Sequence, residues 1–217
     1  MNFQLDIHIP DLDPRIQHNS NIMLIGSCFT EHMTSFLNRN KFNTIQNSHG
    51  IVFNPLSVCK ALSDILDNKK YLKSDLFYLN EYWHSWYHHS DFSDMDQAIT
   101  LQKINQEIEA QHQFLKTTDY LFITLGSAFA YRLLENNIFV SNNHRAPSQW
   151  FEKVLLEIDV IVEQLRHIQT RLIELNPNIR IVFTVSPVRH IRDGVIENNR
   201  SKARLLESIH SLKNVYY

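Results

Sequence analysis

The sequence predicts an α/β protein built on a parallel sheet. Three short apolar runs, at residues 21–25, 120–125 and 179–185, have the length and composition of buried strands. Segments with helical spacing of apolar residues separate the runs. Strands that alternate with helices are joined by crossover connections, which make neighbouring strands parallel. We expect residues 1–217 to form a single domain around one main core.

Helices are expected in four segments between and around these strands. The segments are residues 31–39, 55–67, 95–116 and 148–175. The second begins at Pro55, and proline favours the first turn of a helix. The fourth ends before Pro177, which cannot continue a helix.

Short β-hairpins are expected in two places. Residues 75–89 alternate aromatic and polar side chains around Asn80 and Glu81, which predicts a small aromatic hairpin inserted into the α/β fold. Residues 129–140 turn at two adjacent asparagines, which indicates a second hairpin. Residues 214–217 have the composition of a further strand.

Composition argues against several classes of function. The chain has 21 basic and 23 acidic residues, and the near balance gives no field that would gather nucleic acid. We find no signal peptide and no apolar run long enough to span a bilayer, so we expect a cytoplasmic protein that does not bind membranes. Two irregularly placed cysteines agree with a reducing compartment. The sequence carries no signal of oligomeric state.

Glycines are few, and their positions indicate a site. The chain has only four, where average usage would give about fifteen. Gly26 and Gly126 end two of the predicted strands, and open α/β sheets bind ligands at such ends. A Gly-Ser turn between strand and helix can present the Ser27 hydroxyl to a ligand. Alternatively, Ser27 caps the following helix, a common role for serine.

Several blocks of the sequence resemble one known family. Residues 25–30 read IGSCFT, which is similar to the Gly-Ser-Cys-Phe-Ala signature of the GSCFA family and departs from it at Thr30. Residues 49–55, 124–131 and 184–194 resemble further blocks of that family in the same order. Residues 197–203 continue the resemblance, which therefore covers most of the chain.

The resemblance implies a fold and a chemistry. The GSCFA family is similar to the SGNH, or GDSL-like, hydrolases, whose fold is a three-layer α/β/α sandwich with a flavodoxin-like parallel sheet. By this resemblance Ser27 would be the nucleophile that attacks a small acyl ester, with an O-acetylated carbohydrate as one candidate. The acyl acceptor would decide between hydrolysis and acyl transfer.

The same resemblance suggests oxyanion donors and further substrate contacts. The backbone N–H groups of Ser27 and Gly50 would hold the oxyanion, together with the side chain of Asn54 or Ser127. The wider superfamily has Gly-x-Asn at the third block, where this chain has no asparagine. Gly26 and Gly126 would line the site at the ends of their strands.

A reactive serine also requires a general base. Related enzymes carry an Asp-x-x-His block near the carboxyl end, and this chain is expected to stop before it. His190 is a candidate base within the chain, because two carboxylates lie nearby in sequence. We favour the alternative that Arg189 and His190 bind an anionic or sugar portion of the substrate. Without a base, the protein would be a ligand-binding or accessory domain.

Other histidines have simpler interpretations. His144 either lines the pocket or belongs to a capped surface loop, and we favour the surface loop. His84, His88 and His89 lie close together, but no carboxylate or cysteine completes a metal site, so packing in the aromatic hairpin is the preferred interpretation. We expect neither a metal nor another cofactor. The aromatic hairpin could also stack on a sugar or cover the pocket.

Overall fold

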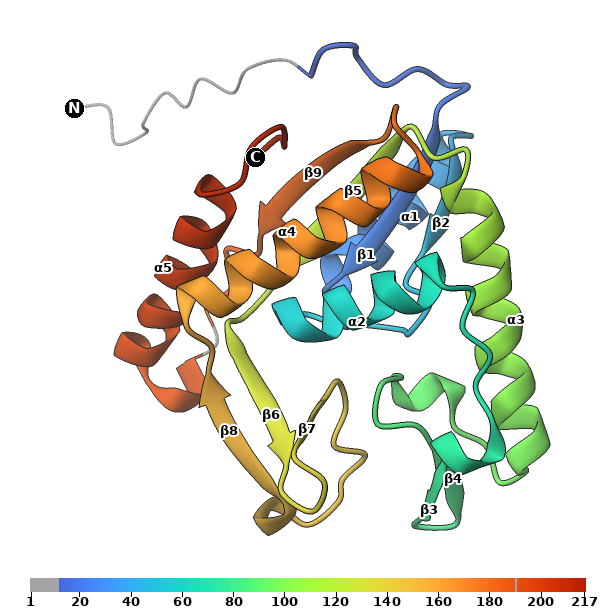
Figure 1. Ribbon diagram of the computed structural model, residues 1–217, viewed down its shortest axis with the longest axis vertical. Helices are drawn as coiled ribbons and strands as arrows, with labels where there is room; N and C mark the ends of the chain where they lie inside the picture. The colour runs from blue at the N-terminus through green and yellow to red at the C-terminus, as the bar shows by residue number, and fades with distance from the viewer. Residues whose placement is uncertain (1–11, 190) are drawn as a thin grey trace.

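A computed structural model of the chain describes residues 12–189 and 191–217 (Figure 1). The main elements in chain order are β1 Asn21–Gly26, α1 Cys28–Arg39, β2 Asn43–Gln46, α2 Pro55–Leu66, α3 Gln97–Leu115, β5 Tyr120–Leu125, α4 Ile158–Leu175, β9 Arg180–Val185 and α5 Val195–His210. The shorter strands are β3 Phe77–Leu79, β4 Tyr82–His84, β6 Phe129–Leu133, β7 Ile138–Val140 and β8 Phe151–Leu155.

The central sheet has four parallel strands in the order β2-β1-β5-β9. Gly26 at the end of β1 is in register with Thr124 of β5, which is in register with Thr184 of β9. Tyr216 adds a parallel bridge to Val182, where a further strand was expected. The carboxyl ends of β1, β5 and β9 therefore meet at one edge of the sheet.

Helices cover both faces of this sheet, as the predicted three-layer fold requires (Figure 1). On one face, apolar side chains of β1, β5 and β9 pack with those of α2, α4 and α5 in the main core. On the other face, Ile22, Leu24 and Tyr120 pack against Met33 and Leu37 of α1. The predicted α/β fold with a parallel sheet is confirmed.

Both predicted hairpins are present. Strands β3 and β4 pair antiparallel, and Asn80 and Glu81 between them have positive φ angles of 49° and 67°. Strands β6 and β7 form the second hairpin, and β8 joins it as a third antiparallel strand.

The predicted helix over residues 148–175 is wrong in its first part. Ser148–Trp150 forms a single 3-10 turn and Phe151–Leu155 forms β8, so the helix begins at Ile158. The reason is tertiary: β8 pairs along its whole length with β6, which satisfies backbone groups that a helix would have paired internally.

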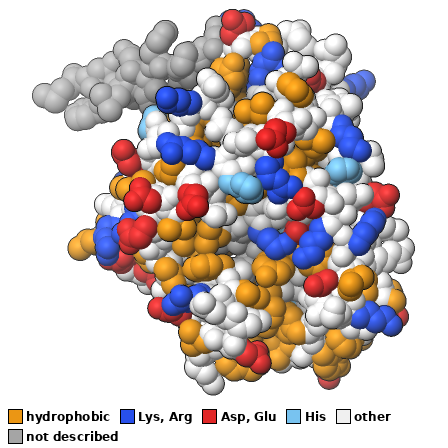
Figure 2. Space-filling view, in the orientation of Figure 1, with side chains coloured by type: hydrophobic (Ala, Val, Ile, Leu, Met, Phe, Trp, Pro, Cys, Tyr) orange, Lys and Arg blue, Asp and Glu red, His pale blue; other side chains and the backbone are white. Residues whose placement is uncertain are grey.

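The surface agrees with the balanced charge. Acidic and basic side chains are interspersed over the face shown in Figure 2. Among the described residues, no helix is both long and apolar enough to cross a membrane.

Candidate functional site

The turn between β1 and α1 requires a glycine at its first position. Gly26 has a φ of 141°, and a Cβ there would lie 2.2 Å from the carbonyl oxygen of Thr124. Only glycine fits this close approach to β5 without strain. Ser27 follows at the N-cap position of α1, at the carboxyl edge of the sheet.

The Ser27 hydroxyl is buried without a hydrogen-bond partner among the described residues. The residue is 8% exposed, and its Oγ has no hydrogen-bond partner among the described residues. Ser27 occupies the N-cap position, yet its side chain makes no capping hydrogen bond. The interpretation of Ser27 as a side-chain helix cap is therefore wrong.

A network of uncharged groups holds the serine turn in place. Asn47, which follows β2, accepts a hydrogen bond from the Gly26 N–H at 2.9 Å and donates one to Thr30 Oγ1 at 2.8 Å. The Thr30 hydroxyl in turn donates to the Ser27 carbonyl oxygen at 2.7 Å. Thr30, where the family signature has alanine, thus links the turn to Asn47. Sequence reasoning missed Asn47, because an asparagine after a strand usually marks only a turn.

The two backbone amides predicted as oxyanion donors have partners within the protein. The Ser27 N–H donates to the Thr124 carbonyl oxygen at 3.2 Å, and the Gly50 N–H donates to the Asn47 carbonyl oxygen at 2.8 Å. In this conformation neither amide points to an open acceptor position. To form an oxyanion hole, both amides would have to break these hydrogen bonds and donate to the substrate oxygen instead.

The segment after Gly50 crosses the carboxyl edge of the sheet. The Val52 N–H donates to the Gly26 carbonyl oxygen at 3.1 Å, and the Gly126 N–H donates to the Phe53 carbonyl oxygen at 2.7 Å. A Cβ at Gly126 would lie 3.0 Å from the Phe53 Cβ, so Gly126 allows this crossing. The predicted glycines are therefore brought together, but around a packed segment of the chain.

Asn54 and Ser127 both have local structural roles. Asn54 caps α2, because its Oδ1 accepts the Ser57 N–H at 2.9 Å. The Ser127 hydroxyl accepts from the Phe129 N–H at 3.1 Å and lies 3.2 Å from the Ser201 hydroxyl of α5. Neither side chain is aimed at Ser27 by these contacts.

Of the remaining predicted site residues, the structure describes His144 and Arg189. His144 is 5% exposed and contacts the Ser85 carbonyl oxygen through Nε2 at 2.8 Å, so it is not a surface residue. It lies against the aromatic hairpin, with its ring centroid 4.4 Å from that of His84. Arg189 is exposed beyond the end of β9. His190 lies outside the described residues.

The histidines of the insertion are held by protein groups. His84 contacts Ser93 Oγ through Nδ1 at 2.6 Å and the Leu79 carbonyl oxygen through Nε2 at 3.0 Å. His88 contacts Ser85 Oγ at 2.9 Å. Within the described part of the chain, no group of three or more potential ligands could hold a metal ion.

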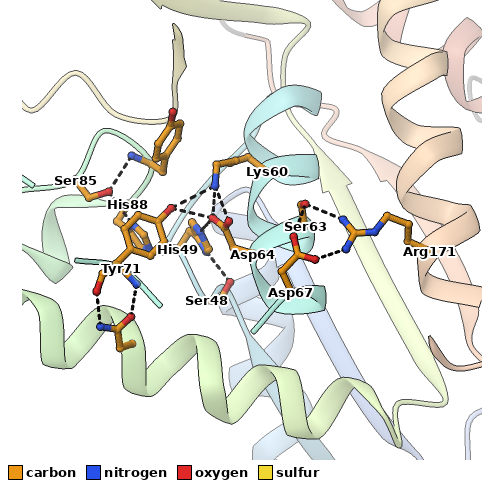
Figure 3. Close-up of polar contacts among 12 residues, drawn as sticks. Ser48, His49, Lys60, Ser63, Asp64, Asp67, Tyr71, Ser85, His88 and Arg171 are labelled. Carbon is orange, nitrogen blue, oxygen red and sulfur yellow. Dashed lines mark hydrogen bonds and ion pairs between the residues drawn. The ribbon is translucent and has the colours of Figure 1, made fainter. Parts of the chain in front are cut away.

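A second polar cluster, which sequence reasoning missed, surrounds Asp64 of α2 (Figure 3). Its carboxylate accepts hydrogen bonds from His49 Nε2 at 2.9 Å, from Lys60 Nζ at 2.5 and 2.6 Å, and from the Tyr71 hydroxyl at 2.8 Å. The His88 ring stacks on His49 with centroids 4.1 Å apart. We call these five residues, together with Ser48, whose hydroxyl contacts His49, the Asp64 cluster. In the sequence, the only local signal of this cluster is the i,i+4 spacing of Lys60 and Asp64, which predicts an ion pair on one helix face.

The Asp64 cluster contains a serine-histidine-aspartate chain. Ser48 Oγ lies 2.8 Å from His49 Nδ1, and His49 Nε2 lies 2.9 Å from Asp64. The residue types are those of a catalytic triad, but the two ring nitrogens are exchanged, because in a triad the serine contacts Nε2 and the aspartate contacts Nδ1. Moreover, Ser48 is 0% exposed and His49 is 1% exposed, so a substrate cannot reach the Ser48 hydroxyl. The chain of hydrogen bonds therefore connects the end of β2 to α2.

Burial sets the charge states in the Asp64 cluster. Desolvation lowers the pKa of His49, although the hydrogen bond to Asp64 works to raise it. Burial works to raise the pKa of Asp64, but the His49 hydrogen bond and the Lys60 charge prevail and hold it at about 2. At neutral pH, His49 is therefore neutral and donates through Nε2, and the charge pair is Lys60 with Asp64.

The fold and the Gly26-Ser27 turn define an α/β protein with a serine at the carboxyl edge of its parallel sheet. The model of the GSCFA family matches residues 21–217, which is most of the chain. The protein therefore belongs to the GSCFA family, as the sequence blocks indicated. No curated protein and no solved structure matched the chain in the corresponding comparisons.

Proposed function

We propose that this protein is an SGNH-like serine hydrolase or acyltransferase that forms an acyl-enzyme on Ser27. The observation that carries the proposal is the buried Ser27 hydroxyl, which neither caps α1 nor bonds to any described residue. A buried polar group without a partner costs about 1–3 kcal/mol. A serine kept in that state at the ligand-binding edge of an α/β sheet is better explained by reactivity than by stability.

The chemistry would proceed in two steps. The Ser27 oxygen attacks the ester carbonyl carbon, the bond from that carbon to the alcohol oxygen breaks, and the alcohol leaves with a proton. Water or an acceptor hydroxyl then attacks the acyl group and releases Ser27. The serine proton goes to a base, for which His190 is the candidate within the chain. The substrate we propose is a small acyl ester, with an O-acetylated carbohydrate as one form of it.

A second candidate, a ligand-binding domain without catalysis, has its own support. The Ser27 and Gly50 amides donate to carbonyl oxygens of the protein, and the Ser27 oxygen is covered. An ester can reach that oxygen only if neighbouring residues move aside. A binding domain has no such requirement, so the two candidates differ in whether Ser27 reacts.

A fluorophosphonate probe tests this difference directly, because it labels activated serines. We expect the wild-type protein to be labelled and Ser27→Ala to remain unlabelled, with the adduct found by mass spectrometry on the peptide that contains Ser27. The His190→Ala variant then tests the base. Loss of labelling in that variant would assign the base to His190, whereas normal labelling would leave it a substrate contact.

Ser48→Ala is the matched control, since Ser48 belongs to the buried triad-like chain. We expect this variant to keep its labelling. Labelling that depends on Ser48 and persists in Ser27→Ala would move the nucleophile to the Asp64 cluster. A folded wild-type protein that is never labelled would favour the binding domain.

A further inference from the structure

A small cavity opens at the carboxyl end of β9, beside α5. Its volume is about 220 Å³, and it lies between Ser186 and Arg189, which follow β9, and Asn198, Asn199 and Lys202 of α5. Whole-ligand pockets usually measure about 300–1,000 Å³. This cavity is therefore the size of a subsite that holds one chemical group of a ligand.

The polar lining of the cavity is cationic. The charged residues in its wall are Arg189 and Lys202, and the side chains of Ser186 and Asn199 add neutral hydrogen-bonding groups. Within the described residues, neither cation forms an ion pair with a carboxylate. Lys202 instead donates to the Gly126 carbonyl oxygen at 2.5 Å, and burial lowers its pKa.

Two acidic residues at the start of α5 already have ion-pair partners. Asp193 pairs with Lys153, and Glu197 pairs with Arg200 at 2.8 Å. The two cavity cations are therefore available to an anion from outside. A carboxylate or phosphate group is the complementary ligand, because charge-assisted hydrogen bonds to such oxygens are the strong ones.

The cavity is close enough to Ser27 to hold part of the same substrate. Gly26 is in register with Thr124, and Thr124 with Thr184, so the chain segments after β1, β5 and β9 lie side by side. Neighbouring strands lie about 4.8 Å apart. Ser27 is thus one strand away from Gly126, the residue that Lys202 contacts. It is two strands, or about 10 Å, away from Ser186.

We propose that the cavity of Arg189 and Lys202 is an anion subsite, and that the ester cleaved or transferred at Ser27 carries a carboxylate or phosphate group held there. The second half of this inference rests on the proposed function of Ser27. The first half, anion binding, does not. The two halves can therefore be tested separately.

The anion subsite is tested by titration of inorganic phosphate into the full chain, followed by calorimetry. We expect wild type and Ser27→Ala to bind phosphate with the same affinity. We expect Lys202→Met and Arg189→Met each to bind phosphate about tenfold more weakly. Lys213→Met is the matched control, because it removes an exposed lysine beyond the end of α5. Unchanged phosphate binding in both cavity variants, or no binding by the wild type, would overturn the subsite.

The substrate half is tested with two nitrophenyl esters, the neutral acetate and the anionic hemisuccinate. We expect kcat/KM to favour the anionic ester, and Lys202→Met to reduce the ratio of kcat/KM for the anionic ester to kcat/KM for the neutral ester about tenfold. Equal losses on both esters would contradict an anion subsite for the substrate. Phosphate binding without hydrolysis dependent on Ser27 would overturn the esterase and leave the subsite standing.

Discussion

Ser27 and Asp64 are two buried polar residues that differ in their hydrogen-bond partners. Asp64 accepts hydrogen bonds from His49, Lys60 and Tyr71, whereas the Ser27 hydroxyl has no partner among the described residues. A satisfied buried carboxylate ties together the elements around it, and an unsatisfied hydroxyl costs stability. The hydrogen bonds of Asp64 give it a structural role, and the absence of such bonds at Ser27 is the observation on which the proposed reactivity of Ser27 rests.

The largest effect expected from this comparison is on Asp64. Asp64→Ala would leave the buried His49 and Tyr71 donors and the Lys60 charge without an acceptor. We expect the free energy of unfolding to fall by about 3 kcal/mol, the lower end for a broken buried pair, because Lys60 can reach solvent. Urea denaturation measures this loss.

Asp67→Ala is the matched control for Asp64. Asp67 ends the same helix and pairs with Arg171 of α4, but its side chain is 57% exposed (Figure 3). We expect a loss of less than about 1 kcal/mol, as for other surface pairs. Equal losses in the two variants would show that the Asp64 cluster adds no more than a surface contact.

Acid should affect the buried histidines in and beside the aromatic hairpin more than the serine turn. Burial lowers the pKa of His144 to about 4, and it lowers the pKa of His88 well below 6.5. The unfolded chain takes up protons at these histidines below pH 6.5, while the folded protein does not. Stability is therefore lost as pH falls from about 6.5 towards 4, by up to about 3 kcal/mol for His144.

The measurement is the urea midpoint at a series of pH values between 7.5 and 4, compared with His144→Gln. A glutamine amide can still donate to the Ser85 carbonyl oxygen that His144 contacts. We expect the variant to lose less stability over this window, because one titrating group is gone. Parallel curves for the two proteins would show that His144 does not control the acid response.

The sequence predicted the centre of the fold better than its edges. Strands β1, β5 and β9 are continuous apolar runs because helices cover both faces of them, and that pattern is local. Strand β2 reads Asn-Thr-Ile-Gln, which has no apolar run, and β8 reads Phe-Glu-Lys-Val-Leu, which neither alternates nor forms an apolar run and lies within a segment that was predicted to be helical. Both depend on a partner strand that is distant in sequence.

The candidate site shows the same limit. A Gly-Ser turn after a strand is a local signal, so Ser27 could be found from the sequence. The Asp64 cluster joins His49, Asp64, Tyr71 and His88, and no spacing rule brings these four together. The contact partners of Gly50 and Gly126 were also unpredictable, because they depend on how residues 50–54 cross the sheet edge.

The smallest effect concerns two helix N-caps in the same protein. Asn54 accepts the Ser57 N–H through its side chain, whereas Ser27 makes no capping bond. Asn54→Ala should therefore reduce the free energy of unfolding by about 1 kcal/mol, the usual value of a lost cap. Ser27→Ala removes a buried hydroxyl that has no partner among the described residues, so we expect the free energy of unfolding to stay the same or to rise by up to about 1 kcal/mol, the lower end of the cost of such a group.

Urea denaturation of both variants beside the wild type makes this comparison, with m-values checked for a common two-state transition. A loss near 1 kcal/mol in Ser27→Ala would mean that the hydroxyl caps α1 in solution. Ser27 would then have a structural role, and its hydroxyl would no longer stand out as reactive. If Ser27→Ala is instead neutral or slightly stabilising and also loses fluorophosphonate labelling, the hydroxyl is needed for reactivity and not for folding.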